Sequence, residues 1–256
     1  AVNLAARAIR VGDGEVYIAG GVESMSRAPY AFSKNTGGGN LIAYDTALGW
    51  RFVNPRMEAL YGTDPMGVTA ENIAEMTGIT RLEQDEFALA SHQRAVAAQD
   101  SGKFGEEILP VSVPQRKGDP VVVSQDERPR RDTSLEALSR LKPAFKPNGT
   151  VTAGNSSGLN DGAAAMLVMS AEKAHALGLK PMARFISSAA SGIEPRIMGL
   201  GPIEATRRAL ARAGLQIGDI SLAEINEAFA VQTLSLIHIC RCRRPTPCSS
   251  RWSAYH

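Results

Sequence analysis

Apolar residues recur at helical spacing in several stretches of the chain. The predicted helices span residues 1–9, 68–76, 80–101, 171–177 and 203–213, and a further helix opens at Thr133. Thr80 and Glu83 form a capping-box pattern at the start of the longest one, and Gly102 stands just past its end. These start and stop residues fix the predicted helix boundaries.

Shorter apolar runs between these helices predict buried strands over residues 16–19 and 163–169, and further strands over residues 184–188 and 222–225. The first of them is expected to stop at Gly20 and Gly21, because paired glycines interrupt regular structure. Strands that alternate with helices at this spacing favour an α/β fold.

A glycine-rich loop precedes the predicted strand 163–169. Gly154, Gly158 and Gly162 follow a short β-branched run, residues 150–152. Such a loop is typical of places where bare backbone comes close to a ligand or to another chain. An ordinary glycine turn before a buried strand explains the same pattern.

Four segments carry a family resemblance, and they occur in the family's order. They are Ala19-Gly-Gly-Val-Glu-Ser-Met-Ser26, Met66-Gly-Val-Thr-Ala-Glu-Asn72, the stretch from Gly149 to Ser170, and Asn226-Glu-Ala-Phe-Ala230. The chain resembles the thiolases, which are coenzyme A-dependent acyltransferases that make or cleave β-ketoacyl thioesters. The resemblance implies an α/β thiolase-like layered fold of two similar α/β halves, incomplete at both ends, with an inserted loop domain.

The resemblance also implies a division of the chain into domains. Residues 1–28 and 161–181 would belong to the N-terminal thiolase half, and residues 182–233 would begin the C-terminal half. Residues 29–160 would form the loop domain that covers coenzyme A.

Family positions suggest which residues bind coenzyme A. Met57 and Met66 would line the pantetheine channel, Met198 is also placed among the coenzyme A contacts, and Arg130 would face the nucleotide phosphates. Arginine suits phosphate because its planar fork donates two hydrogen bonds. Arg130 could equally be a solvated charge in the run of residues 128–131, where a neighbouring arginine could serve instead.

Three further positions are expected near the reacting groups or the pantetheine arm. Ser157 would contact the arm, although it could be a turn-stabilising serine. Asn226 would position a water that stabilises the enolate or thioester oxygen, and Ala228 and Phe229 would border the substrate channel. Asn226 could instead cap a following helix, with Glu227 in its first turn.

The resemblance implies acyl transfer between coenzyme A and an acyl-CoA through a thioester on cysteine, with coenzyme A thioesters as substrates and no metal or redox cofactor. That chemistry needs two cysteines and a histidine. The first cysteine is expected before Ala1, and the motifs G-H-P and C-x-G-G-G are missing after Asn226. We therefore expect an interior fragment that is catalytically inactive and exposes apolar surface.

Residues 49–55, Gly-Trp-Arg-Phe-Val-Asn-Pro, resemble the branch of the family that acts on 3-oxoadipyl-CoA in aromatic breakdown, while acetoacetyl-CoA remains open. Two other functions are considered. Gly154 to Gly158 fits G-x-S-x-G, so Ser156 could be the nucleophile of a serine hydrolase. The chain could also be a coenzyme A-binding remnant without catalysis.

The C-terminal residues distort the charge and the cysteine count. From Ser235 onward there are four arginines and no acidic residue, so removing them turns 28 basic against 26 acidic residues into 24 against 26, and the net charge from +2 into −2. All three cysteines also lie there, at positions 240, 242 and 248. Residues 234–239 resemble a translated sequencing-library adaptor, so we interpret residues 234–256 as a non-native tail and exclude them from fold reasoning.

A metal site at His238, Cys240 and Cys242 would be the functional alternative for this segment, as would a basic nucleic-acid patch. The lone His92 lies mid-helix and is interpreted as solvated or structural. No apolar run is long enough to span a bilayer. We expect a soluble cytoplasmic protein with neither membrane nor nucleic-acid partners, whose full-length parent is a homo-oligomer.

Overall fold

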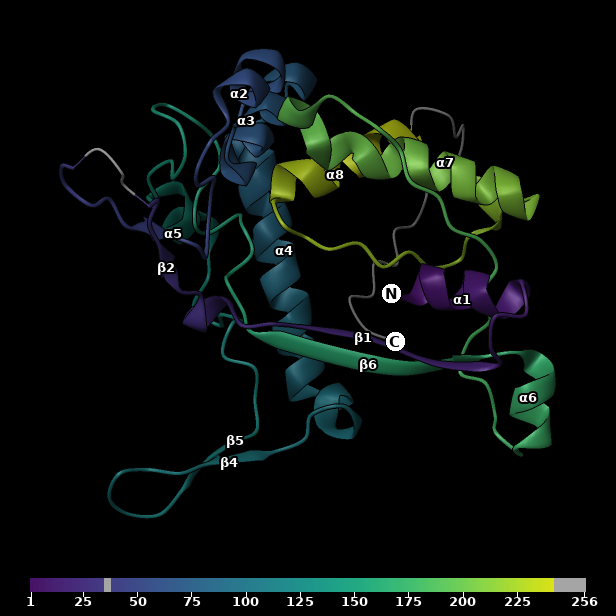
Figure 1. Ribbon diagram of the computed structural model, residues 1–256. Coiled ribbons are helices and arrows are strands. Elements are labelled where there is room, and N and C mark those ends of the chain that lie inside the picture. Colours follow the sequence, from purple (N-terminus) through teal and green to yellow (C-terminus); the bar gives the residue numbers. More distant parts are fainter. Residues whose placement is uncertain (35–37, 242–256) are drawn as a thin grey trace. The chain divides into compact units, whose positions relative to one another are not determined.

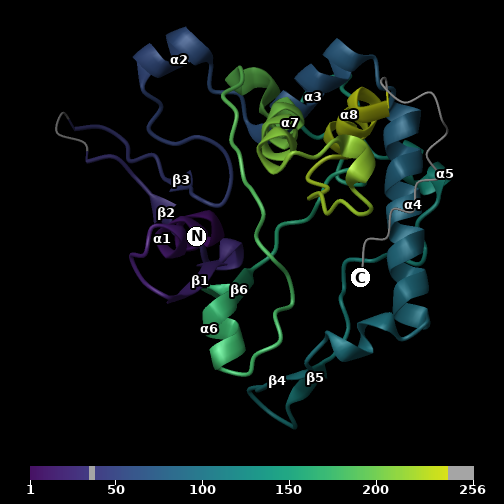
Figure 2. The ribbon, with the colours of Figure 1, turned by 90° about the vertical axis from the view of Figure 1, so that its right-hand side faces the viewer.

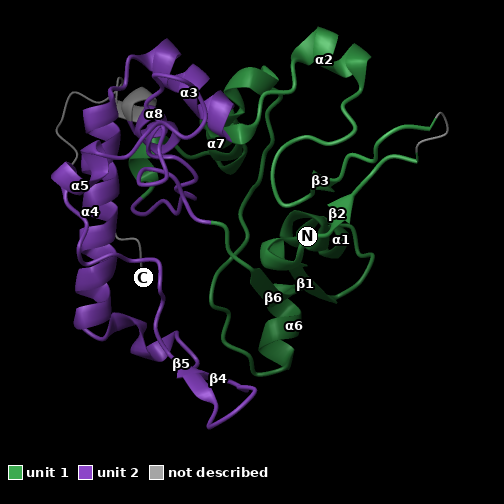
Figure 3. Cartoon of the chain, turned by 90° about the vertical axis from the view of Figure 1, so that its left-hand side faces the viewer, with its two compact units in different colours: residues 1–66, 159–220 green, residues 67–158, 221–256 purple. Residues whose placement is uncertain are grey.

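The computed structural model describes residues 1–34 and 38–241, with side chains as far as residue 237. Of the described residues, those within 1–66 and 159–220 form one compact unit, and those within 67–158 and 221–241 form the other (Figure 3). Each unit therefore joins segments that lie far apart in the chain. The domain boundaries expected from the thiolase resemblance differ from these units and stay a prediction.

The first unit contains four α-helices and four strands among its described residues. The helices are α1 (Val2–Arg10), α2 (Pro55–Tyr61), α6 (Ala171–Ala176) and α7 (Gly201–Ala213), and the strands are β1 (Val16–Glu23), β2 (Tyr30–Ala31), β3 (Tyr44–Asp45) and β6 (Gly162–Met169). The predicted helices 1–9, 171–177 and 203–213 are confirmed to within two residues at each end.

Strands β1 and β6 form an antiparallel ribbon, on which α1 packs (Figure 1). The ladder runs without a break from the pair Val16 and Met169 to the pair Glu23 and Gly162. The expected stop at Gly20 and Gly21 is wrong, because both glycines pair with small alanines of β6 and the ladder continues through them.

The prediction that residues 163–169 form a buried strand is half right. They lie in β6, but most of β6 is exposed. Ile18 and its partner Leu167 are 79% and 61% exposed, and Val22 on the same face is 79% exposed. Apolar surface of this kind was expected from the sequence, and an apolar run alone does not say whether anything packs against it.

Residues 184–188, predicted to be a strand, form no strand and pair with none among the described residues. Their backbone is held by α7 instead. Ser187 Oγ donates to the carbonyl of Ala209 at 2.7 Å, and Arg212 Nη1 donates to the carbonyl of Ser188 at 2.5 Å. Residues 222–225 likewise form no strand. Apolar runs predict extension, whereas a strand also needs a neighbouring backbone.

Two family motifs meet in the first unit. Asp161, from the stretch 149–170, accepts a hydrogen bond from the amide of Ser26 at 2.9 Å and another from its hydroxyl. Ser26 lies in a 3-10 turn, Met25–Arg27, directly after β1. The carboxylate therefore ties the end of β1 to the beginning of β6.

The second unit is organised around α4. Its helices are α3 (Met66–Thr77), which starts at the last residue of the first unit, α4 (Arg81–Asp100), α5 (Leu135–Ser139) and α8 (Ala230–Arg241), and its strands are β4 (Val111–Val113) and β5 (Val121–Val123). Helices α5 and α8 pack against α4 (Figure 2). No described helix combines the length and the apolarity that crossing a membrane requires.

The sequence places most helix ends of this unit correctly. Thr80 and Glu83 form both hydrogen bonds of the capping box, and Gly78 and Gly102 have positive φ angles of 71° and 73°. Helix α5 begins one residue later than predicted, because Ser134 rather than Thr133 accepts the capping bond from an amide.

Residues 234–241, which the sequence pattern left without structure, continue α8. Ser235 and Leu236 are buried there, with 0% and 4% exposure. The adaptor origin of this segment stays a prediction. Residues 242–256 and the side chains of His238 and Cys240 lie outside the described part of the chain, and so does the metal site considered for them.

Bonds from the hydroxyl and the amide of Ser26 lower the pKa of the exposed Asp161 carboxyl. The tie is therefore present above the ordinary aspartate range and is lost as the pH falls through this lowered pKa. We expect the Ser26 amide resonance to titrate with a midpoint below the usual aspartate pKa in an NMR series. Asp161→Ala should abolish that transition, and a Ser26 resonance unchanged by acid in the parent chain would contradict the tie.

Candidate active site

A buried carboxylate lies beneath the glycine-rich loop. Glu71 of α3 is 2% exposed, and its Oε1 accepts hydrogen bonds from the amides of Thr150 and Val151 at 2.9 and 2.8 Å. Its Oε2 accepts from the amide and the hydroxyl of Thr150 at 2.9 and 3.1 Å. Because a buried charge is costly without such donors, Glu71 fixes the backbone of residues 150–151.

The turn before Thr150 is shaped to reach this carboxylate. Asn148 has a positive φ of 57°, a conformation that asparagine tolerates better than most residues. The amide of Gly149 donates to the carbonyl of Lys146 at 3.0 Å. A Cβ on Gly149 would collide with Glu71 Oε1, so only glycine lets the backbone come this close.

Helix α4 adds a second set of buried polar groups. Asp85 is 2% exposed, and it accepts hydrogen bonds from Asn155 Nδ2 at 3.0 Å and from Arg81 Nε at 2.7 Å. Asn155 Nδ2 also donates to the carbonyl of Thr150 at 3.1 Å, and Gln84 Nε2 donates to Thr150 Oγ1 at 3.0 Å. Thr150 is thus held from both α3 and α4.

The loop then folds back on itself. The amide of Thr152 donates to Asn155 Oδ1 at 2.8 Å, and Ser156 Oγ donates to the carbonyl of Thr152 at 2.7 Å. A Cβ on Gly154 would lie 2.5 Å from the side chain of Leu138. Gly154 therefore permits a close approach within this unit, where the sequence suggested a ligand or another chain.

Ser156 does not form the nucleophile elbow that G-x-S-x-G suggested. An elbow places the serine on a strained turn from a strand into a helix. No helix follows Ser156 before β6, and positive φ angles at described non-glycine residues occur only at Phe52 and Asn148. Its hydroxyl donates to a backbone carbonyl, so the geometry speaks against a serine hydrolase.

The loop meets the segment that contains the second candidate motif. The amide of Ala230 donates to the carbonyl of Asn155, and the amide of Ser157 donates to the carbonyl of Ala228, both at 2.9 Å. Ser156 and Phe229 form an isolated antiparallel bridge. Three predicted site residues, Ser157, Ala228 and Phe229, therefore lie together in the second unit.

Asn226 comes just before this junction and is exposed. Because α8 begins only at Ala230, Asn226 stands too far from the helix to be its N-cap. The next residue, Glu227, is held by α4, since Ser91 Oγ donates to its Oε2 at 2.7 Å. The amide of Asn226 is thus left facing solvent at the edge of the junction.

Arg130 lies in the same unit and is bonded to α4. Its backbone amide donates to His92 Nδ1 of α4 at 3.2 Å, while its guanidinium lies 3.3 Å from Asp132 and is 66% exposed. Bonding to Arg130 lowers the pKa of Asp132, and bonding to Asp132 raises the pKa of Arg130. Arg131 is paired with Asp100 at 2.7 Å. Arg130 is therefore an exposed cation, and an anion that binds it more tightly than Asp132 does could replace that carboxylate.

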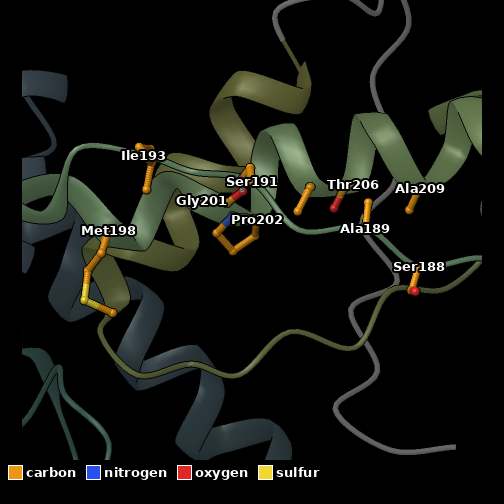
Figure 4. Close-up of a pocket in the computed structure, with 10 residues that line it drawn as sticks. Ser188, Ala189, Ser191, Ile193, Met198, Gly201, Pro202, Thr206 and Ala209 are labelled. Carbon is orange, nitrogen blue, oxygen red and sulfur yellow. Dashed lines mark hydrogen bonds between the residues drawn. The ribbon is translucent and has the colours of Figure 1, made fainter. Parts of the chain in front are cut away.

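The three predicted methionines are exposed. Met57 of α2 and Met66 at the start of α3 are 42% and 53% exposed. Met198 is 46% exposed and lies at one end of a groove of about 550 Å³ along α7, with Ser188 at the other end (Figure 4). The groove lies within the first unit.

Sequence reasoning missed the buried residues that shape this site, Glu71, Asp85 and Asn155. A signal for Glu71 existed, because it falls on the apolar face of the predicted helix 68–76, beside Ala70 and Ala74. A carboxylate on the buried face of a helix needs donors from elsewhere in the fold. Its partners, however, lie nearly eighty residues away in the sequence.

Comparisons with known proteins agree on one family. A family model described as the N-terminal domain of thiolase matches residues 1–172, and one described as the C-terminal domain of thiolase matches residues 179–244. A β-ketoadipyl-CoA thiolase of Acinetobacter baylyi is 52% identical over 237 residues, which are 92% of this chain and 59% of that protein. The 3-oxoadipyl-CoA/3-oxo-5,6-dehydrosuberyl-CoA thiolase of Escherichia coli K12 is 52% identical over 239 residues.

Solved structures give the same result. The acetyl-CoA acetyltransferase of Bacillus anthracis matches with a TM-score of 0.83 at 42% identity, over 94% of this chain and 60% of that one. The corresponding enzyme of Syntrophomonas wolfei matches with a TM-score of 0.84. The α/β thiolase fold expected from the sequence is thereby confirmed, and the chain spans about 60% of the length of these relatives.

Removing the buried carboxylate should unfold the loop. We expect Glu71→Ala to lower the free energy of unfolding by about 3–5 kcal/mol, because the amides of Thr150 and Val151 lose their acceptor inside the fold. Glu75→Ala is a matched control one turn further along α3, whose exposed ion pair with Lys146 is worth about 0–1 kcal/mol. Urea unfolding measures both, and equal midpoints would contradict the role of Glu71.

Proposed function

The chain belongs to the thiolase family, and we propose that it forms the coenzyme A side of a thiolase-type acyltransferase site. The reaction interconverts a β-ketoacyl-CoA plus coenzyme A with an acyl-CoA plus acetyl-CoA or succinyl-CoA. The observation that carries this proposal is the junction of residues 152–158 with residues 226–230, two motifs that are some seventy residues apart in the sequence.

The junction offers the groups that a pantetheine arm and a thioester need. The exposed Ser157 can hydrogen-bond an amide of the arm, while Ala228 and Phe229 provide apolar surface for its methylene groups. Asn226 carries an uncharged amide that can orient a water toward a developing oxyanion. The backbone at the junction is already hydrogen-bonded, so these side chains are placed before substrate arrives.

Arg130 takes the phosphates of the nucleotide. Its bond to Asp132 is long, at 3.3 Å, and both partners are exposed, so a phosphate can displace the carboxylate at little cost. Met57, Met66 and Met198 would contact coenzyme A through flexible apolar side chains. No metal or redox cofactor is part of the proposed reaction.

The nucleophile of the family reaction is not among residues 1–239, which contain no cysteine. Acyl transfer through a cysteine thioester also needs a histidine base and a second cysteine. We therefore propose that this chain binds coenzyme A without turning over a β-ketoacyl-CoA. The absence of cysteine from residues 1–239 suits a reducing compartment such as the cytoplasm.

A 3-oxoadipyl thioester is the proposed substrate class. Several relatives at about half identity are named β-ketoadipyl-CoA thiolases, and residues 49–55 gave the same indication from the sequence. Other relatives at similar identity are named acetyl-CoA acetyltransferases, so acetoacetyl-CoA is the second candidate.

Calorimetric titration of the purified chain with coenzyme A tests the proposal. We expect saturable binding that Arg130→Ala weakens by about 10- to 100-fold, the worth of a charge-assisted hydrogen bond. Arg140→Ala, which removes an exposed arginine paired with Glu136, should leave the affinity unchanged. Absence of binding to a folded parent chain would contradict the proposal, as would equal affinities of the two variants.

A further inference from the structure

Two adjacent side chains in the middle of α4 bond two different segments of the site. Ser91 Oγ donates to Glu227 Oε2 at 2.7 Å, which holds the segment beginning at Asn226. His92 Nδ1 accepts from the amide of Arg130 at 3.2 Å, which holds residues 128–132, the arginine loop. The two segments are almost a hundred residues apart in the sequence, yet both are hydrogen-bonded to the same turn of one helix.

This turn belongs to a well-anchored helix. The capping box of Thr80 and Glu83 fixes the start of α4, and Asp85 joins it to the buried network beneath the loop. Helices α5 and α8 pack against it. A contact with α4 therefore fixes a segment more firmly than a contact with another loop would.

The bond to Arg130 also defines the chemical state of His92. A backbone amide can only donate, so Nδ1 must be unprotonated and a neutral ring carries its proton on Nε2. The charged groups that act on the ring are Arg130 and Asp132 from the arginine loop and Glu227 from the segment after Asn226. Charges from both segments that α4 holds therefore act on the His92 ring.

We propose that Ser91 and His92 are positioning residues, which hold Asn226 and Arg130 in mutual register on α4 so that the nucleotide and the reacting end of coenzyme A are placed together. The inference rests on the proposed function of those two residues. Ser91 and His92 themselves touch no reacting atom.

The two bonds should respond differently to pH. Burial, followed by the charge of Arg130, lowers the pKa of His92 from its usual 6.5, while Asp132 and Glu227 act in the opposite direction. Above this lowered pKa the ring is neutral and accepts the amide. As the pH falls through it, Nδ1 gains a proton, the acceptor is lost, and the imidazolium repels Arg130. The bond between Ser91 and Glu227 needs no proton on the ring.

The experiment uses the whole chain and compares three substitutions with the parent. His92→Asn keeps an acceptor near the position of Nδ1 but does not titrate, whereas His92→Phe removes the acceptor. Ser91→Ala removes the donor to Glu227. Gln93→Ala changes the next, exposed residue of α4 and is the matched control.

The readouts are the NMR amide resonances of Arg130 and Ala228 and the affinity for adenosine 3′,5′-bisphosphate, at several pH values. We expect the Arg130 resonance and the affinity in the parent to follow the titration of His92, and His92→Asn to remove that pH dependence. His92→Phe should weaken binding about two- to tenfold at neutral pH, the worth of one hydrogen bond. Ser91→Ala should shift Ala228 and leave Arg130 unshifted.

Two results would overturn the proposal. One is an Arg130 amide resonance whose chemical shift neither follows the titration of His92 nor changes in the His92 variants. The other is an Nδ1-protonated ring at neutral pH, read from the imidazole nitrogen shifts. If the bisphosphate fails to bind while Arg130 still follows His92, the positioning stands and the phosphate role of Arg130 falls.

Discussion

The buried carboxylate of Glu71 is the constraint on which the site depends. A charge with 2% exposure has almost no water, so the backbone amides of Thr150 and Val151 must solvate it. That need explains the left-handed turn at Asn148 and the absence of a side chain at Gly149. The path of the chain into the loop is therefore set before any ligand arrives.

Hydrogen bonds connect Thr150 to α4 and to the junction of residues 152–158 with residues 226–230. Asn155 bonds both the carbonyl of Thr150 and the carboxylate of Asp85, and its own carbonyl accepts the amide that begins α8. A loop determined at so many points cannot shift one bond without breaking others. The edge at Ser157 and Ala228 is thus held in place before any ligand binds, as the proposed contact with a pantetheine arm requires.

Local chemistry made the helices predictable. Thr80, Glu83 and Gly102 act through neighbours a few residues away, so their role can be read from the sequence alone, and α4 has the predicted ends. The order of four motifs was enough to indicate the thiolase family, which the comparisons confirm.

Features that depend on distant partners were not predictable in this way. The segment at Ser187 is held by α7 rather than by a strand, the apolar positions of β6 are mostly exposed, and residues 234–241 form a helix without a regular apolar face. Glu71 could be suspected from its apolar neighbours, but its partners follow only from the folded chain. The predicted ligand roles of Arg130, Ser157 and Asn226 remain predictions, because a ligand site is defined by what it binds.

Amide hydrogen exchange of the whole chain, with and without coenzyme A, can test whether the buried carboxylate fixes the loop before a ligand binds. We expect Thr150 and Val151 to be already protected without ligand, and coenzyme A to add protection at residues 128–132, 152–158 and 226–230. Rapid exchange at Thr150 and Val151, or ligand-induced protection confined to other segments, would contradict it.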